Sequence, residues 1–237
     1  MTVAQDHPPP FVLFGAAHVV AMAIVALVSV VLVWTVRVRP HLAPLVRAGL
    51  IAGIAVLVAF ELAVAAREGW LTVKTFLPLE LCDAAMLLAV ATLAHPRAAT
   101  AELLYFWAGS GTLLAIVTPE LPWGFPRWEF VVFLGLHGLV LAAAALLVFG
   151  LGLHPRPGAP RRAFLLTAGW AALVAVVNAA LGTNFMYLRR KPAAPTPLDW
   201  MGPWPVYILS GAAVALVLFH LLALPFRREW RTARAGN

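Results

Sequence analysis

The stretch FLPLELCDAAMLL, residues 76–88, places two carboxylates and the only cysteine of the chain at the start of an apolar run. On a helix, Glu80 and Asp83 are three residues apart and share a face, whereas Cys82 lies about 100° round from Asp83. A thiol becomes a good nucleophile when a base or a cation favours the thiolate, and neighbouring carboxylates disfavour it. The stretch therefore predicts a reactive cysteine only if another segment supplies a base.

The candidate base is His137, in the stretch FLGLHGLVL, because it is the strongly polar group in the middle of an apolar segment. Cysteine–histidine dyads meet in space and have no fixed sequence spacing, so the separation from Cys82 is no objection. Each residue also has an ordinary structural interpretation. A lone cysteine in an apolar helix packs as a small hydrophobe, and a lone histidine can hydrogen-bond within the fold.

The composition indicates that these residues lie in a membrane. The chain is 62% hydrophobic and 11% charged, whereas a soluble domain is about half apolar and a quarter charged. A helix needs about 20 apolar residues to cross the hydrocarbon core. Seven segments qualify: 11–36, 45–66, 77–95, 99–117, 128–150, 163–183 and 203–225. We expect an all-α, polytopic transmembrane helix bundle of about seven spans, forming a single integral membrane domain over residues 1–237.

The charged residues that give the net charge of +7 lie in loops between apolar runs. This placement fits membrane topology and argues against a nucleic-acid partner. With the N-terminus outside, the inner loops hold 11 of the 17 Lys and Arg residues and the outer loops hold 6. The positive-inside rule therefore predicts the N-terminus out and the C-terminus in. The cluster 189–191 is the exception. The abundance of Ala, Arg and Pro indicates a GC-rich bacterial genome, and hence the bacterial inner (plasma) membrane.

Polar residues gather in the outer half of the expected membrane. Five different spans place His18, Glu61, Cys82, His137 and Asn178 there, each about 8–14 Å from the outer end of its span at 1.5 Å per residue. Ionisable groups within spans are costly, so each marks a candidate functional site. One polar cavity that opens toward the outer side explains the distribution most simply.

Several motifs carry a family resemblance. The segments LPLELCDAA, YFWAGSGTLLAIVTPEL, LHG, GTNFMYLRRKP and GPWP resemble the YwaF-like family of integral membrane proteins, over roughly residues 75–210. Eukaryotic relatives of that family are described as lipid acyltransferases that use a cysteine nucleophile and a histidine to move acyl chains between phospholipids. The resemblance implies that Cys82 is the nucleophile and that His137 is its partner.

The resulting hypothesis is a membrane acyltransferase that moves an acyl chain to a lysophospholipid through a thioester on Cys82. It needs no cofactor and no metal. Because acyl-CoA is cytosolic, a cavity that opens outward predicts a phospholipid donor and CoA-independent transacylation. The other expected site residues bind or orient the substrate. Asn178 and Asn184 are candidate oxyanion donors. Glu80 or Asp83 would orient His137, or would bond Tyr187 or Arg189. The basic residues Arg189 and Arg190, with Lys191, would bind phosphate. Glu61 would face the cavity.

Two alternatives come from other classes of protein. A transporter or lipid-binding protein would use the same outward-facing polar cavity for a solute or a head group, and would not need Cys82. A metal site would combine Cys82, His137, His18 and a carboxylate, a mixture that suits zinc. The sequence shows no HxxxH or CxxC spacing that supports the metal site.

Overall fold

The computed structural model of the chain describes residues 9–72, 76–192 and 196–235. Its regular elements are helices, apart from an isolated bridge between Pro10 and Trp123. The α-helices are α1 (Ala16–Val38), α2 (Ala43–Glu68), α4 (Leu81–Ala94), α5 (Ala98–Trp107), α6 (Leu113–Val117), α7 (Trp128–Ala145), α8 (Ala159–Leu181), α9 (Val206–Leu222) and α10 (Arg227–Ala235). The short 3₁₀- or π-helical segments are η1 (Pro40–Leu42), η2 (Ala108–Thr112), η3 (Leu146–Gly150), η4 (Phe185–Tyr187), η5 (Pro197–Met201) and η6 (Leu224–Phe226).

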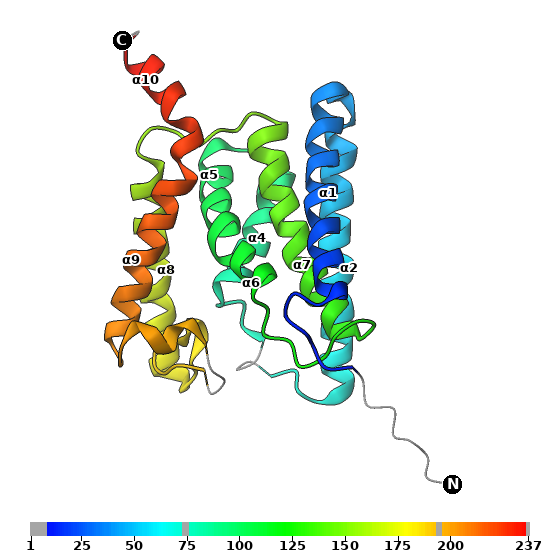
Figure 1. Cartoon of the computed structure of the whole chain (residues 1–237), viewed down its shortest axis with the longest axis vertical. Coiled ribbons are helices and arrows are strands. Elements are labelled where there is room, and N and C mark those ends of the chain that lie inside the picture. Colours follow the sequence, from blue (N-terminus) through cyan, green and yellow to red (C-terminus); the bar gives the residue numbers. More distant parts are fainter. Residues whose placement is uncertain (1–8, 73–75, 193–195, 236–237) are drawn as a thin grey trace.

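The helices run alternately up and down, as a membrane bundle requires. In the described part of the chain, six helical segments are long and apolar enough to cross a membrane, and α4, with 14 residues, is a shorter apolar helix. The beginning of α1 and the helix α10 lie at opposite ends of the bundle (Figure 1). The fold confirms the expected all-α polytopic bundle. We call the end at which α1 begins the outer end, following the charge bias.

The centre of the bundle is formed by α4, α5, α6 and α7, with α1 and α2 on one side and α8 and α9 on the other (Figure 1). Half of the residues of α7 are buried, whereas the outer helices expose large apolar side chains such as Leu27, Val56 and Val176. These exposed residues suit contact with lipid. Gly138 of α7 lets α1 approach closely, because a Cβ at this position would lie 2.6 Å from Val25 Cγ2.

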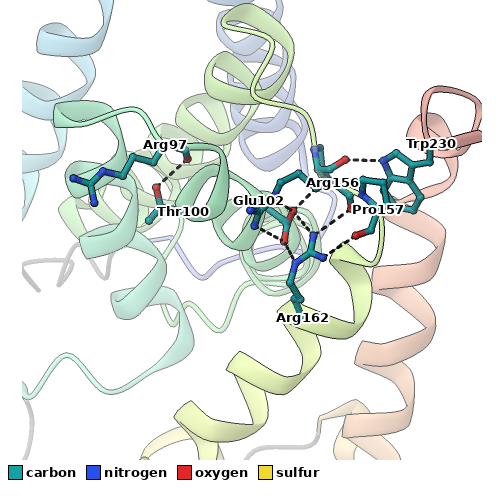
Figure 2. A network of polar contacts seen from close by, with 8 residues as sticks. Arg97, Thr100, Glu102, Arg156, Pro157, Arg162 and Trp230 are labelled. Atoms are coloured by element: carbon teal, nitrogen blue, oxygen red, sulfur yellow. Dashed lines mark hydrogen bonds and ion pairs between the residues drawn. The ribbon is translucent and has the colours of Figure 1, made fainter. Parts of the chain in front are cut away.

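A charged network closes the inner end of the bundle. Glu102 of α5 is 3% exposed and accepts hydrogen bonds from the guanidinium groups of Arg156 and Arg162 (Figure 2). Trp230 of α10 donates to the Pro155 carbonyl at 2.8 Å. The carboxylate therefore ties α5 to the loop before α8 and to α8 itself, and this pairing accounts for a buried charge in a weakly apolar span.

The helix α4 begins four residues later than the expected span of 77–95. Pro78 lacks a backbone N–H and favours extended backbone before it, and Glu80 precedes the helix in an extended conformation. Non-helical backbone is tolerated at membrane depth where it is buried in protein or lines a cavity. Glu80, the last residue of this segment, lines a cavity at the outer end of the bundle.

Candidate active site

A cavity of about 620 Å³ opens among α4, α6, α7 and the loops at the outer end of the bundle. Its polar lining comes from Glu61, Glu80, Cys82, Asp83, Thr112, Thr118, Glu120, Glu129, His137, Tyr187 and Thr196. Its apolar lining includes Met86, Leu114, Leu136 and Val140. The cavity thus brings together Cys82, His137 and four more of the residues predicted from the sequence.

Cys82 lies in the first turn of α4, two residues after Glu80, which precedes the helix. It is partly exposed and free. The first N–H groups of a helix have no partner within it, and the helix dipole places positive charge at this end. This end of the helix therefore opposes the effect of the neighbouring carboxylates on the thiol, and it suits an oxyanion that forms beside Cys82.

His137 lies in the middle of α7, about 14 Å along the helix from Trp128. Its Nδ1 atom is 2.8 Å from the Phe133 carbonyl oxygen, and its ring stacks on the Phe133 ring at a centroid distance of 4.1 Å. A carbonyl oxygen only accepts, so Nδ1 carries the hydrogen and Nε2 of the neutral ring has a free lone pair. This tautomer is the one that a general base needs.

The two side chains reach one cavity from different depths of their helices. Both α4 and α7 begin at the outer end and pack against each other. The non-helical segment 77–80 spans the outer part of the bundle, so α4 begins only after it. A residue in the first turn of α4 can therefore face a residue far along α7. Among the described residues, no hydrogen bond joins the Cys82 thiol to His137, and such bonds are often long before substrate binds.

The cavity is strongly acidic. Five of the ten acidic residues of the chain line it, namely Glu61, Glu80, Asp83, Glu120 and Glu129, and no Lys or Arg of the described residues does. Arg127 neutralises Glu129 from outside the lining, at 2.9 Å. The remaining carboxylates repel anionic groups and attract cationic ones.

Glu80 does not orient the histidine, as one of the sequence hypotheses held. Its carboxylate accepts the backbone N–H of Met186 at 2.9 Å, whereas the Phe133 backbone and ring hold His137. Met186 and Tyr187 both have a positive φ, of 55° and 51°, which is unusual for residues other than glycine. Glu80 therefore stabilises a strained turn in the loop that covers the cavity.

Tyr187 lines the cavity from this loop and donates a hydrogen bond to Glu120 at 3.3 Å. Tyr207 donates to the Tyr187 carbonyl oxygen from α9. Burial, and then the negative charge of Glu120, raise the pKa of the Tyr187 hydroxyl, so this tyrosine remains a donor. The expected bond to Glu80 or Asp83 is replaced by one to Glu120, a residue that the sequence reasoning missed.

Asn178 and Asn184 do not line the cavity, and their amides are occupied. Asn178 is fully buried; it donates to the Phe185 carbonyl and accepts from the Phe185 N–H and the Thr183 hydroxyl. Asn184 accepts from the backbone N–H groups of 189 and 190 and donates to a carbonyl of the same loop. Both asparagines build the covering loop, so the geometry gives no support to their expected role as oxyanion donors.

The basic cluster also lies outside the cavity lining. Arg189 and Arg190 are exposed, and Arg189 donates to the Asn178 carbonyl oxygen at 3.2 Å. Lys191 lies 3.8 Å from an Asp199 carboxylate oxygen. The cluster therefore occupies the outer surface of the loop, where a phosphate would meet it at the rim and not beside Cys82.

His18 is not available as a metal ligand. Its Nδ1 atom accepts the Phe14 N–H at 3.1 Å and its Nε2 atom lies 2.8 Å from the Ile116 carbonyl oxygen. His220 is exposed on α9 and bonds the Leu216 carbonyl oxygen. Across the described ranges, no three His, Cys, Asp or Glu side chains are arranged to hold a metal ion. The geometry thus gives no support to the zinc alternative.

These features define the class of protein: a polytopic integral membrane protein with an acidic cavity whose wall carries a thiol and an imidazole. The chain belongs to the TMEM164 family, whose model matches residues 13–223. The match extends well beyond the motifs of residues 75–210. No curated protein and no solved structure gives a significant match to the chain. The YwaF-like relationship and the activity that it implies stay predictions.

Proposed function

We propose that this protein is a phospholipid acyltransferase that works through a thioester on Cys82. The observation that supports it most directly is that Cys82 and His137, from two different helices, line one cavity, with His137 held in the tautomer of a base. Thiol and imidazole from separate segments form the usual arrangement for nucleophilic catalysis. The apolar lining gives room for an acyl chain.

In the first half of the reaction, His137 Nε2 takes the thiol proton and the Cys82 sulfur attacks the ester carbonyl of a donor lipid. The carbonyl electron pair moves to oxygen, and the N–H groups of the first turn of α4 stabilise the charge. When the electron pair returns, the bond to the glycerol oxygen breaks. The leaving lysolipid takes the proton from His137, and the acyl chain stays on sulfur.

In the second half, a lysophospholipid acceptor enters the cavity. His137 takes the proton of its hydroxyl, and the oxygen attacks the thioester carbonyl. The thiolate leaves and recovers the proton from His137, which restores the enzyme. The acyl chain has moved from one lipid to another without an external energy source.

The donor is a membrane phospholipid and not acyl-CoA. The cavity lies at the end of the bundle with the fewer Lys and Arg residues, which the positive-inside rule places outside the cytosol. Labelled acyl-CoA and labelled phospholipid, supplied separately to the purified protein in vesicles, test this assignment. Label on Cys82 from phospholipid alone is expected. Transfer from acyl-CoA alone contradicts the outward-facing assignment.

The acidic lining also indicates which class of phospholipid is the preferred donor. Unpaired carboxylates beside the thiol disfavour anionic head groups, and a zwitterionic head group brings a cation that they attract. Trp128, Phe133 and Tyr187 line the same cavity, and aromatic faces also bind cations. A zwitterionic phospholipid is therefore the preferred donor, with Arg189 and Arg190 available to phosphate at the rim.

The central test is mass spectrometry of the intact protein isolated from membranes. We expect an acyl adduct on Cys82 that hydroxylamine removes and that is absent in Cys82→Ser. The adduct forms far more slowly in His137→Ala. The matched control is His220→Ala, because His220 makes the same bond to the carbonyl four residues earlier and lies on the lipid-facing side. A wild-type protein that never carries the adduct would falsify the proposal.

A transporter or lipid-binding protein is the second candidate, and the acidic cavity is what favours it. Such a protein would bind a cationic solute or head group through Glu61 and Glu120, both of which line the cavity. Cys82→Ala would leave this binding intact, whereas Glu61→Gln would weaken it. Acyl transfer that depends on Cys82 excludes this candidate as the whole function.

A further inference from the structure

Two cavity-lining residues, Thr112 and Thr196, have a buried hydroxyl with no hydrogen-bond partner among the described residues, and Thr112 is the one on a helical segment that packs against α4 and α7. Several helical Ser and Thr side chains in this protein bond the carbonyl four residues earlier, as Ser29, Ser110 and Thr167 do at 2.6–2.8 Å. Thr112 is 1% exposed and lines the cavity, but its hydroxyl has no hydrogen-bond partner among the described residues. A buried unsatisfied hydroxyl costs about 1–3 kcal/mol, so the Thr112 hydroxyl lowers the stability of the folded protein.

Thr112 is the last residue of a π-helical segment, η2 (Ala108–Thr112). Insertions of this kind in α-helices occur frequently at functional sites. The wider turn changes the position of the preceding carbonyls relative to the side chain. Thr112, at the end of this segment, lacks the local bond that Ser110, two residues earlier, retains to the Phe106 carbonyl.

The same segment lies between the two helices that carry the thiol and the imidazole. The segment η2 packs against both α4 and α7. A Cβ placed on Gly111 would lie 3.5 Å from Leu81 Cδ2, so the backbone beside Thr112 contacts the residue that precedes Cys82. Three neighbouring elements thus present Thr112, Cys82 and His137 to one cavity.

We propose that Thr112 is a catalytic residue, whose hydroxyl hydrogen-bonds the oxyanion that forms when Cys82 attacks the ester carbonyl. This inference rests on the proposed acyl transfer. It gives Thr112 the role of oxyanion donor, for which the sequence had suggested Asn178 and Asn184. Threonine in a helix has two accessible χ1 rotamers, so rotation directs Oγ1 into the cavity when a carbonyl oxygen arrives to accept its hydrogen.

The chemistry is balanced without another reactant. The Cys82 proton passes to His137 Nε2, the S–C bond forms and the carbonyl electron pair moves to oxygen. The Thr112 O–H donates to this oxygen and keeps its own hydrogen throughout. The pair then returns, the bond to the glycerol oxygen breaks, and the lysolipid leaves with the proton from His137. The same hydroxyl serves when the acceptor attacks the thioester.

The test uses the full-length protein in vesicles that contain equal amounts of dioleoyl phosphatidylethanolamine and dioleoyl phosphatidylglycerol. Thr112→Val removes the hydroxyl and keeps the shape. We expect the maximal rate of Cys82 acylation to fall by roughly 100-fold, with little change in the lipid concentration that gives half-maximal rate. Alkylation of Cys82 by iodoacetamide forms no oxyanion, so its rate is expected to stay within twofold.

Two further variants separate the hydroxyl from the packing. Thr112→Ser keeps a donor and is expected to retain most of the acylation rate. Thr92→Val is the matched control, because Thr92 is also 1% exposed with an unpartnered hydroxyl but does not line the cavity. Should Thr112→Val fail to fold, Thr112→Ala gives the same comparison with a smaller side chain.

Each outcome decides the proposal. A slow Thr112→Val acylation with normal alkylation, and an active Thr112→Ser, support the oxyanion role. An unchanged acylation rate overturns it, as does an equal loss of acylation and alkylation, which indicates a displaced thiol. Failure of the proposed function itself is distinct, because the wild-type protein then forms no adduct at all.

Discussion

The Glu80 carboxylate accepts the backbone N–H of Met186, 106 residues away, at 2.9 Å. This bond joins the residue that precedes α4 to the strained turn of the loop between α8 and α9. The loop also places Tyr187 against the cavity. The start of the helix that carries Cys82 and the covering loop are therefore positioned together.

Glu80→Ala is expected to release the loop. A hydrogen bond to a charged acceptor contributes about 2 kcal/mol, and the turn at Met186 and Tyr187 is already strained. Limited proteolysis checks this, because cleavage after Arg189 or Arg190 should become faster. The matched variant Glu229→Ala removes an exposed carboxylate at the inner end and should leave the cleavage rate unchanged. Equal cleavage in the two variants would contradict the assigned role of Glu80.

Glu102→Gln is expected to lower stability without altering the chemistry of Cys82. The carboxylate side chain is 4% exposed and pairs with two half-exposed arginines, so its loss leaves positive charge without a partner and costs ~1–3 kcal/mol. Thermal unfolding in detergent should show a lower Tm. The control is Glu229→Gln, whose partner His154 is at the surface. A normal Tm for Glu102→Gln would show that the network in Figure 2 contributes little.

The cavity is expected to open to the side opposite the C-terminus. Cys82 is the only cysteine, so labelling of whole cells by a small, membrane-impermeant methanethiosulfonate reports on this residue alone. Labelling from outside intact cells is expected, and Cys82→Ser should abolish it. Reaction only after the cells are opened would reverse the orientation that the charge bias predicts, and with it the reason for a phospholipid donor.

Head-group charge is expected to decide which lipid reacts first. In vesicles with equal amounts of phosphatidylethanolamine and phosphatidylglycerol whose acyl chains carry different isotopes, the Cys82 adduct should come mainly from the zwitterionic lipid. Removing one cavity carboxylate, in Glu61→Gln, should reduce this preference by about fivefold, the effect of ~1 kcal/mol per charge pair. The ratio of the isotopes in the adduct measures it. A preference for the anionic lipid in the wild-type protein would be incompatible with the acidic lining.

The amino-acid sequence was sufficient for the helices and for the residues of the candidate dyad. Hydrophobicity is a local property, so apolar runs of about 20 residues identify spans whatever their neighbours are, and the expected spans correspond to the helices of the structure. Polar groups are costly in these runs, which is why Cys82, His137 and Glu61 stood out. All three line the cavity.

The tertiary structure decided which polar residues share that cavity. Asn178 and Arg189 lie nine and two residues from the cavity-lining Tyr187 in the sequence, yet both make hydrogen bonds that hold the loop. Thr112 and Glu120 gave only weak signals, because a hydroxyl or a carboxylate near a helix end is ordinary in sequence. The rotation of each helix, the late start of α4 and the path of the covering loop depend on packing between distant segments. That packing determines whether a side chain faces the cavity, another helix or lipid.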